Sequence, residues 1–322
     1  MSVKEVKIAI LILLSVICLS SCGGTQTKVS KHDMVRPAFV ADSAYAHIKT
    51  QLSLGPRVPG TDAHADCVDF IVKKLSSYGA SVEIEEGYMK DYAGEKQLVR
   101  NIIARLGDPN AKHRLLLSTH YDSRPWSDED DEAYRYVGVP AANDGASGVA
   151  VLLEIARQLS LRNTLSMPID MVFFDCEDMG TPTFIEDSGR PDTWCLGSQL
   201  WAQKEEHKGL YDWGILLDMV GAPGATFYKE YYSVQQASNY VDLIWSNAAS
   251  LGYDKIFSSQ QGTPIVDDHL YVNKGLGIPC VDIIHTLPQG GFPAWWHTQE
   301  DNMMQIDRAT LQAVGEVVLS VL

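Results

Sequence analysis

The sequence predicts a single α/β domain with a mixed, mostly parallel central β-sheet flanked by helices. Short apolar runs, of the kind buried on both faces of a sheet, alternate along the chain with helical periodicity. Apolar residues make up 45% of the 322 residues, which is enough for a sizeable core. No internal repeat and no long linker divides residues 37–322, so these residues are expected to form one domain.

The first predicted elements of this domain are a helix and two strands. Asp62 is placed to cap a helix over residues 63–78, whose apolar side chains recur at helical spacing, and Gly79 ends it. Residues 82–88 alternate as a half-buried strand does, and residues 98–106 follow as a second strand. An antiparallel pairing of these two strands would make the sheet mixed.

The later strands are short and continuously apolar, which is typical of strands covered on both faces. They are expected at residues 114–119, 169–175, 214–220 and 279–284. Helical patterns separate or follow them at residues 145–161, 197–204, 233–251 and 307–322. This alternation predicts parallel strands joined by helical crossovers.

The amino terminus is predicted to be a targeting segment outside the fold. Two lysines precede an apolar run, residues 8–19, that is too short to span a bilayer and is typical of a signal peptide. The run ends in Leu-Ser-Ser-Cys at Cys22, which resembles the lipobox of bacterial lipoproteins. We therefore expect a signal peptide at residues 1–21 and a polar tether at residues 22–36.

The resemblance to a lipobox implies that Cys22 is lipidated and becomes the mature amino terminus. Gly23 stands where an aspartate would retain a lipoprotein on the inner membrane, which implies an outer-membrane anchor facing the periplasm. The alternative is an ordinary cleaved signal peptide in which Cys22 is incidental. Both interpretations predict an exported protein.

The formal net charge of −15 at pH 7 argues against two classes of partner. A nucleic-acid-binding surface needs a basic patch, and attachment to an anionic membrane surface needs clustered lysine and arginine. Most of the acidic side chains are therefore assigned to a solvated surface. A monomer is expected, although no feature of the sequence decides the oligomeric state.

Four cysteines remain in the predicted domain, at Cys67, Cys176, Cys195 and Cys280. Four cysteines allow three disulfide connectivities, so the sequence of an exported protein leaves their pairing open. Cys176 and Cys280 lie within apolar runs, where a buried free thiol is expected. No Cys-x-x-Cys pair occurs, which argues against a zinc site built from cysteine.

Polar side chains gather where the predicted strands end. His120 and Asp122 follow the strand at 114–119, and an Asp-Cys-Glu-Asp run at 175–178 follows the next one. Similar positions are held by Asn143, Asp144, Asp218 and His285. Because ligands bind beyond the carboxyl ends of parallel strands, these groups are expected to converge on one crevice.

Each of these groups alone has a structural explanation. An aspartate before a helix, such as Asp144, is usually an N-cap, and a lone histidine is usually a hydrogen-bonded structural residue. Their convergence indicates a metal, because clustered carboxylates are costly unless a cation neutralises them or some are protonated. Carboxylates and imidazole without thiolate suit zinc in an open catalytic site with three protein ligands.

The order of these motifs resembles two related families. One comprises the zinc aminopeptidases that bind two co-catalytic metals, and the closer one comprises the glutaminyl cyclases, which share that fold and hold one zinc. The motifs that carry the resemblance lie at residues 173–178, 216–223, 267–269, 292–298 and 300–302.

This resemblance implies one zinc ion held by Asp144, Asp178 and His297. It also implies that Glu177 is the general acid/base. Animal cyclases carry Glu where this chain has Asp178, but the shorter side chain still supplies a carboxylate oxygen. Val266 stands where those enzymes carry Gln, so one hydrogen bond to the substrate is expected to differ.

The resemblance further implies that Asp218 and Asp267 form a hydrogen-bond network near the leaving group. The choice of Asp267 over Asp268 rests only on the spacing to His269. Three aromatic residues are expected to form the walls of a pocket for the glutamine side chain, with ordinary core packing as the alternative: Trp194, Phe292 and Trp296. Residues 181–192 are expected to form a loop over the site, and no role follows for the acidic residues 126–136.

The implied activity is that of a glutaminyl-peptide cyclotransferase, an acyltransferase that turns the N-terminal glutamine of peptides and proteins into pyroglutamate and releases ammonia. Zinc would polarise the γ-carbonyl, and Glu177 would move the proton. One alternative is a zinc aminopeptidase of the same fold with two metals and water as nucleophile. Another is a lipoprotein that binds peptides or cell-wall fragments without catalysis. His120 does not decide between the enzymes, because both families keep it.

Overall fold

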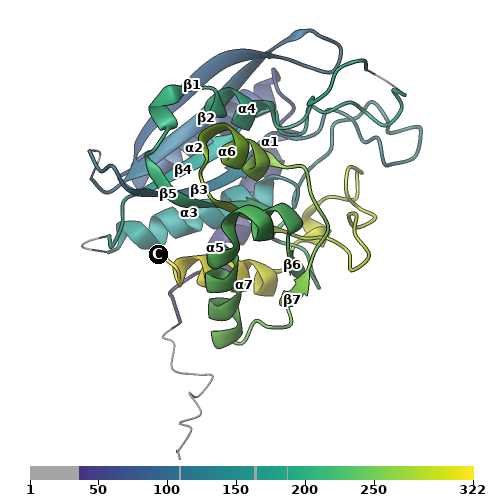
Figure 1. The fold of residues 1–322 in the computed structure, drawn as a ribbon. Coiled ribbons are helices and arrows are strands. Elements are labelled where there is room, and N and C mark those ends of the chain that lie inside the picture. The colour runs from purple at the N-terminus through teal and green to yellow at the C-terminus, as the bar shows by residue number, and fades with distance from the viewer. Residues whose placement is uncertain (1–35, 109, 163–164, 187) are drawn as a thin grey trace, which may run out of the picture.

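The computed structural model describes residues 36–322 apart from residues 109, 163–164 and 187. Its centre is a six-stranded sheet with the order β1-β2-β4-β3-β5-β8 (Figure 1). The strands are β1 (Ser81–Lys90), β2 (Lys96–Leu106), β3 (Arg114–His120), β4 (Ile169–Phe174), β5 (Tyr211–Asp218) and β8 (Cys280–Ile284). β2 pairs antiparallel with β1 and β4, whereas the other pairings are parallel. The predicted mixed, mostly parallel sheet is confirmed.

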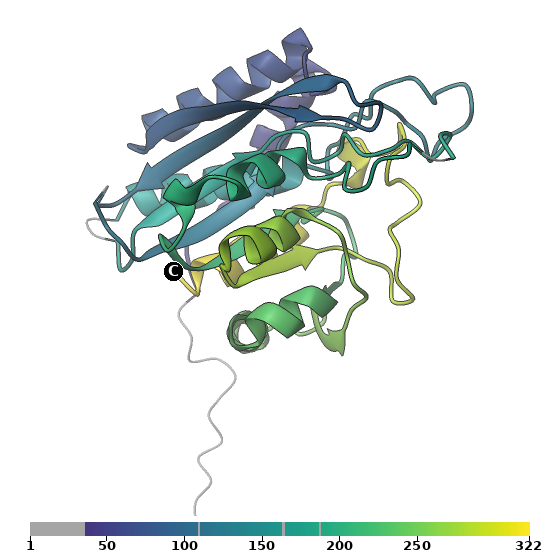
Figure 2. The same ribbon diagram turned by 45° about the horizontal axis from the view of Figure 1, so that its top comes forward.

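Helices cover both faces of this sheet (Figures 1 and 2). One face carries α1 (Ala41–Leu54), α2 (Asp62–Ser77), α3 (Ala146–Ser160), α5 (Tyr231–Ser250) and α7 (Arg308–Leu319). The other face carries α4 (Leu196–Ala202) and α6 (Asp268–Leu276). Leu115 and Leu117 of β3 enter the larger core while Leu116 enters the smaller one. Burial on both faces explains why β3, β4, β5 and β8 are mostly apolar.

Four features of the secondary structure differ from the expectation, one of which is that the short helix α6 was not predicted. The cap of α2 is Thr61 and not Asp62, because the Thr61 side chain accepts the His64 backbone N–H at 3.3 Å. The helix α1 was not predicted, since its buried side includes His47 and Gln51 and its apolar periodicity is therefore weak. A small parallel sheet of β6 (Phe227–Lys229) and β7 (Phe257–Gln261) was also missed. Two short 3-10 turns, Glu205–His207 and Met303–Gln305, complete the elements.

The predictions for the signal peptide, for Cys22 and for residues 22–35 of the tether lie outside the described residues. Arg36, the last residue assigned to the tether, is already part of the fold, because its guanidinium donates to Glu316 Oε2 at 2.7 Å and to the Tyr253 hydroxyl at 2.9 Å. No helix in the described part of the chain is both long enough and apolar enough to cross a membrane. The four cysteines of the domain are free and buried, as expected for Cys176 and Cys280.

Candidate active site

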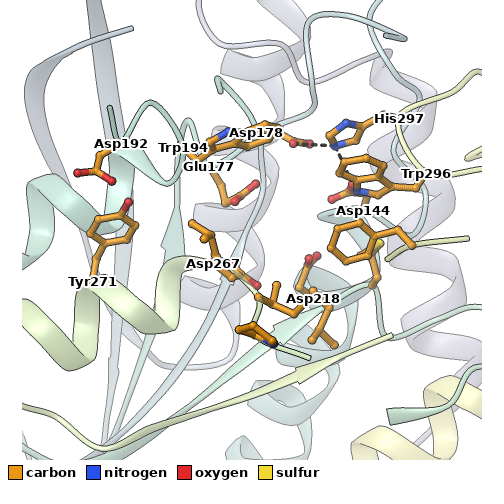
Figure 3. A pocket seen from close by; sticks show the side chains of 16 residues that line it. Asp144, Glu177, Asp178, Asp192, Trp194, Asp218, Asp267, Tyr271, Trp296 and His297 are labelled. Atoms are coloured by element: carbon orange, nitrogen blue, oxygen red, sulfur yellow. Dashed lines mark hydrogen bonds and ion pairs between the residues drawn. The ribbon is translucent and has the colours of Figure 1, made fainter. Parts of the chain in front are cut away.

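The residues that follow β4, β5 and β8 open onto a cavity of about 410 Å³ (Figure 3). All nine predicted site residues line this cavity: Asp144, Glu177, Asp178, Trp194, Asp218, Asp267, Phe292, Trp296 and His297. Seven further lining residues were not in the predicted set: Asp192, Met219, Pro264, Ile265, Val266, Tyr271 and Ile284. The structure thus brings the predicted residues together, while the role of each stays a prediction.

Asp144, Asp178 and His297 form a compact group at one end of the cavity. His297 Nε2 lies 3.1 Å from Asp178 Oδ1 and 3.7 Å from Asp144 Oδ2. Ligand atoms about 2.0–2.1 Å from a tetrahedral zinc ion lie about 3.3 Å apart, which is close to both distances. Asp178 Oδ2 is buried and has no hydrogen-bond partner among the described residues. The group therefore fits zinc in both donor type and spacing.

The charges of the site also favour a cation. Burial and the neighbouring carboxylates of Asp178 and Asp218 raise the pKa of Asp144 to about 6. Burial opposes the ionisation of Asp178 as well, but the adjacent His297 brings the pKa of this carboxyl below its usual range. A bound divalent cation would stabilise the ionised form of both carboxyls and remove the cost of holding them together.

Glu177 and Asp178 are held by a buried carboxylate beneath their turn. Asp122 accepts the backbone N–H of Glu177 through Oδ1 and that of Asp178 through Oδ2, each at 3.1 Å. Asp122 is fully buried and does not line the cavity. Asp122 therefore has a structural role: it accepts hydrogen bonds that fix the backbone from which the side chains of Glu177 and Asp178 extend.

His120 lies between two carboxylates of the site. Its Nε2 is 3.0 Å from Asp144 Oδ1 and 3.2 Å from Asp218 Oδ1, and its Nδ1 faces Asp122 Oδ1 at 3.4 Å. Although burial opposes its charge, these carboxylates raise the pKa of His120 well above the usual range. His120, Asp144 and Asp218 thus form a second group with metal-ligand spacing. Because the two groups share Asp144, the described residues offer donors for one metal or for two.

The loop that carries Asp144 is held from two sides. Asp301 accepts the backbone N–H groups of Asn143 at 2.9 Å and Asp144 at 3.0 Å. The fully buried guanidinium of Arg57 donates to the carbonyls of Pro140 at 2.6 Å and Ala141 at 2.7 Å. Sequence reasoning missed Arg57 because it lies far from Asp144 in the chain and no local pattern marks it.

A buried ion pair between Arg124 and Asp128 supports the other two residues of the metal group. Arg124 donates to both carboxylate oxygens of Asp128, at 2.6 and 2.5 Å, and to the backbone carbonyl of Asp178 at 3.0 Å. Its guanidinium also lies 4.6 Å from the centre of the Trp194 ring. Asp128 in turn faces His297. Asp128 belongs to the acidic stretch 126–136, for which the sequence indicated no role.

The three predicted catalytic carboxyls, Glu177, Asp218 and Asp267, all line the cavity (Figure 3). Glu177 is 8% exposed and lies within metal-ligand spacing of both Asp178 and Asp267. Burial and the adjacent Asp178 raise the pKa of Glu177 well above the usual range. The pKa of Asp267 is raised in the same way by burial and by the carboxylates of Asp218 and Asp268. Asp267 lines the cavity and its neighbour Asp268 does not.

Aromatic and aliphatic side chains also line the cavity. The rings of Phe292 and Trp296 pack with centroids 4.6 Å apart. They join an apolar cluster whose buried members are Met219, Ile265 and Ile284. The Trp194 ring lies parallel to the His297 imidazole, with a centroid distance of 5.9 Å and an interplanar angle of 12°. Trp295 packs against the core and does not line the cavity.

The loop predicted over the site reaches the cavity at its last residue. Asp192 lines the cavity together with Tyr271, at the end away from His297 (Figure 3). The loop is tied down near its start, where the Thr183 backbone N–H donates to Asp128 Oδ2 at 2.9 Å. Tyr271 lies on the short helix α6, and no sequence signal distinguished it from a core residue.

Comparisons with known proteins fit this geometry. Residues 101–322 match the model of peptidase family M28. The glutaminyl cyclase of Tannerella forsythia is 50% identical, and the match covers 88% of this chain and 98% of that one with a TM-score of 0.85. The chain belongs to the glutaminyl cyclases of peptidase family M28.

Two further relatives show the breadth of this family. A zinc-dependent exopeptidase from Parabacteroides distasonis is 46% identical, over 89% of this chain and 99% of that one, with a TM-score of 0.85. The glutaminyl-peptide cyclotransferase of Drosophila melanogaster is 29% identical over 287 residues, which are 82% of this chain and 75% of the relative. The fold and the family predicted from the motifs are therefore confirmed.

Proposed function

We propose that this member of the glutaminyl cyclases converts the N-terminal glutamine of peptides and proteins into pyroglutamate and releases ammonia. The observation that carries the proposal is the position of Glu177. Its buried carboxylate lies beside the Asp144–Asp178–His297 group in a cavity with an aromatic wall. The glutaminyl cyclases among the relatives support the same activity.

The cavity suits a substrate that reacts with itself. The α-amine of glutamine must fold back onto its own γ-amide carbon, and a pocket that holds this compact conformer supplies much of the rate gain of an intramolecular reaction. Phe292 and Trp296 offer an apolar wall for the methylene groups and keep water away from the reacting atoms. Val266 also lines the pocket but offers no side-chain hydrogen bond to the peptide.

The proton transfer needs one group that can both accept and donate. As the amine nitrogen bonds to the γ-carbon, Glu177 takes a proton from that nitrogen. It then gives a proton to the amide nitrogen, the bond between carbon and this nitrogen breaks, and ammonia leaves; no water is consumed. General acid–base catalysis of this type contributes typically about 10²–10⁴-fold. Zinc, when bound by Asp144, Asp178 and His297, would supply a Lewis acid for the γ-carbonyl oxygen.

Asp218 and Asp267 are assigned to the leaving-group side. The two carboxyls lie close enough for Asp218, together with burial, to raise the pKa of Asp267, which favours the protonated form of Asp267. A carboxylate of such a pair can accept a hydrogen bond from the departing nitrogen. Glu177 lies within metal-ligand spacing of Asp178 in the metal group and of Asp267 in this pair.

A zinc aminopeptidase is the competing function, and two observations favour it. The group of His120, Asp144 and Asp218 could hold a second metal, and several relatives are named zinc-dependent exopeptidases or aminopeptidases. We propose that one zinc ion per chain is bound. Metal analysis of purified protein separates the two functions, because one tightly bound zinc supports the cyclase and two support the peptidase.

We also propose that the protein works in the periplasm, as a monomer anchored to the outer membrane through Cys22. The support for the periplasmic location and for the anchor is the sequence of residues 1–24 alone. Mass spectrometry of the mature amino terminus tests the anchor. A lipidated Cys22 supports it, and an unmodified mature terminus contradicts it.

The activity is tested with purified protein that begins near Arg36 and a peptide that begins with glutamine. Products are followed by mass spectrometry. Loss of one ammonia with unchanged chain length supports the cyclase. Free glutamine and a shortened peptide would contradict it and favour the aminopeptidase.

A further inference from the structure

Cys195 lies directly against the proposed acid/base. Its Sγ is 3.1 Å from Glu177 Oε1, within reach of an S–H···O hydrogen bond. Burial and the Glu177 carboxylate raise the pKa of this thiol well above its usual range, so the thiol keeps the proton that it donates. Among the described residues, no other side chain hydrogen-bonds to the Glu177 carboxylate.

Backbone hydrogen bonds around Cys195 hold its thiol next to the Glu177 side chain. The Cys195 N–H donates to the Glu177 carbonyl at 2.8 Å, and the Leu196 N–H donates to the Cys176 carbonyl at 3.1 Å. The start of α4 is thereby paired with the turn after β4. Gly197 permits this approach, because a Cβ at that position would collide with the Asp175 carbonyl.

Both sides of this pairing adopt an unusual backbone conformation. Cys176 has a φ of 53° and Cys195 has a φ of 57°, in the left-handed region that residues with side chains rarely occupy. Such residues persist where the surrounding structure over-determines them, and they cluster at functional sites. At Cys195 this conformation accompanies a side chain that contacts Glu177.

We propose that Cys195 is a positioning residue, whose thiol binds Glu177 Oε1 and directs Oε2 toward the reacting nitrogens. A glutamate side chain has several rotatable bonds, and a carboxylate with no fixed partner samples many orientations. One hydrogen bond to one oxygen restricts them and leaves the other oxygen for the substrate. The inference rests on the proposed function, because this orientation matters to the reaction only if Glu177 transfers the proton.

The kinetic test compares Cys195→Ala with Cys195→Ser. Loss of the donor is expected to lower kcat by about 10–100-fold, the range for a hydrogen bond to a charged group, while KM changes less than about twofold. The serine hydroxyl restores a donor and is expected to recover most of kcat. Zinc content should match the wild type in both variants, because Cys195 hydrogen-bonds to Glu177 and not to a residue of the metal group.

Cys280→Ala is the matched control. Cys280 is also a buried free thiol, but it is the first residue of β8, four residues before Ile284, where this strand reaches the cavity. We expect Cys280→Ala to keep the wild-type kcat. This result, with a lower kcat in Cys195→Ala, would show that the loss comes from the thiol beside Glu177 and not from removing any buried thiol. An equal loss in both variants would overturn the inference.

The hydrogen bond itself is tested by infrared spectroscopy of the S–H stretch, a readout that needs no turnover. The band of Cys195 is identified as the one that disappears in Cys195→Ala. It is expected at lower frequency than the other thiols, because its acceptor is a carboxylate, and it should shift in Glu177→Gln. A band that Glu177→Gln does not move would overturn the inference.

The kinetic outcomes separate this inference from the proposed function. Full kcat in Cys195→Ala, with an active wild type, would overturn the positioning role alone. So would equal losses in the alanine and serine variants. A wild-type chain that forms no pyroglutamate would contradict the proposed function and the inference with it.

Discussion

His297 Nδ1 faces Asp128 Oδ1 at a distance of 3.6 Å. The other ring nitrogen, Nε2, points to Asp178 at 3.1 Å. Although burial opposes its ionisation, Arg124 and the nearby His297 hold the pKa of Asp128 below the usual range, so this side chain is a carboxylate. A carboxylate behind a metal-binding histidine orients the ring and favours the tautomer that leaves the far nitrogen free for the metal.

We therefore expect Asp128→Asn to weaken zinc binding by about 10–100-fold, the usual effect of losing such a partner. The affinity is measured by competition with a chromogenic chelator. Asp131→Asn is the control, because Asp131 is an exposed acid of the same stretch. Unchanged affinity in Asp128→Asn would show that the carboxylate does not support His297.

Replacing Glu177 separates chemistry from metal binding. Glu177→Gln keeps the size of the side chain but cannot accept a proton, so kcat is expected to fall by about 10²–10⁴-fold with zinc retained. His297→Ala is expected to lose both zinc and activity. Metal analysis and pyroglutamate formation are measured on both variants. Near-wild-type turnover in Glu177→Gln would contradict the acid/base role.

Removal of zinc is expected to lower the thermal midpoint. A metal that binds only the folded chain stabilises it by about 2.7 kcal/mol when its free concentration is 100 times the dissociation constant. Calorimetry before and after chelation measures the change, and added zinc should reverse it. The midpoint of His297→Ala should not respond to chelation. A response of equal size in that variant would place the stabilising metal elsewhere.

Replacing Arg57 is expected to destabilise the fold and to loosen the metal group. Arg57→Met leaves the carbonyls of Pro140 and Ala141 without their buried donor, at a cost of at least about 3 kcal/mol. Urea unfolding measures this loss. Arg100→Met is the control, because the ion pair of Arg100 with Glu86 is partly exposed and contributes less than about 1 kcal/mol. Equal losses in the two variants would contradict the role of Arg57.

His47 is expected to contribute to acid sensitivity. Burial lowers the pKa of this ring to about 4, while in the unfolded chain it titrates near about 6.5. Below about pH 6.5 the unfolded chain takes up a proton at His47 that the folded chain does not. The free energy of unfolding is therefore at its full value above about pH 6.5 and falls by about 3 kcal/mol as the pH decreases to about 4. Unfolding free energies measured across this range should fall less steeply in His47→Leu. Parallel profiles of wild type and variant would contradict the prediction.

The sequence predicted the helices and strands whose apolar side chains recur at regular spacing. It did not reveal residues whose role depends on partners far along the chain. The strands β3, β4, β5 and β8 were recognisable because both of their faces are buried. Glu177, Asp178 and Asp218 were recognisable because they lie at strand ends. Asp128 and Arg57 carry no such signal, since their partners lie far along the chain and become neighbours only in the fold. Helix α1 was missed for a related reason, because its buried face mixes Ile48 with His47 and Gln51.

The contact between Arg57 and the Asp144 loop also sets a limit on how short a working enzyme can be. The match to family M28 begins at residue 101, inside β2 and well after Arg57. A fragment cut back to that boundary would keep every lining residue of the cavity and would still lose the guanidinium that holds Pro140 and Ala141. The smallest active version of this chain must therefore begin before Arg57, and the boundary of the matched segment is a poor guide for truncation.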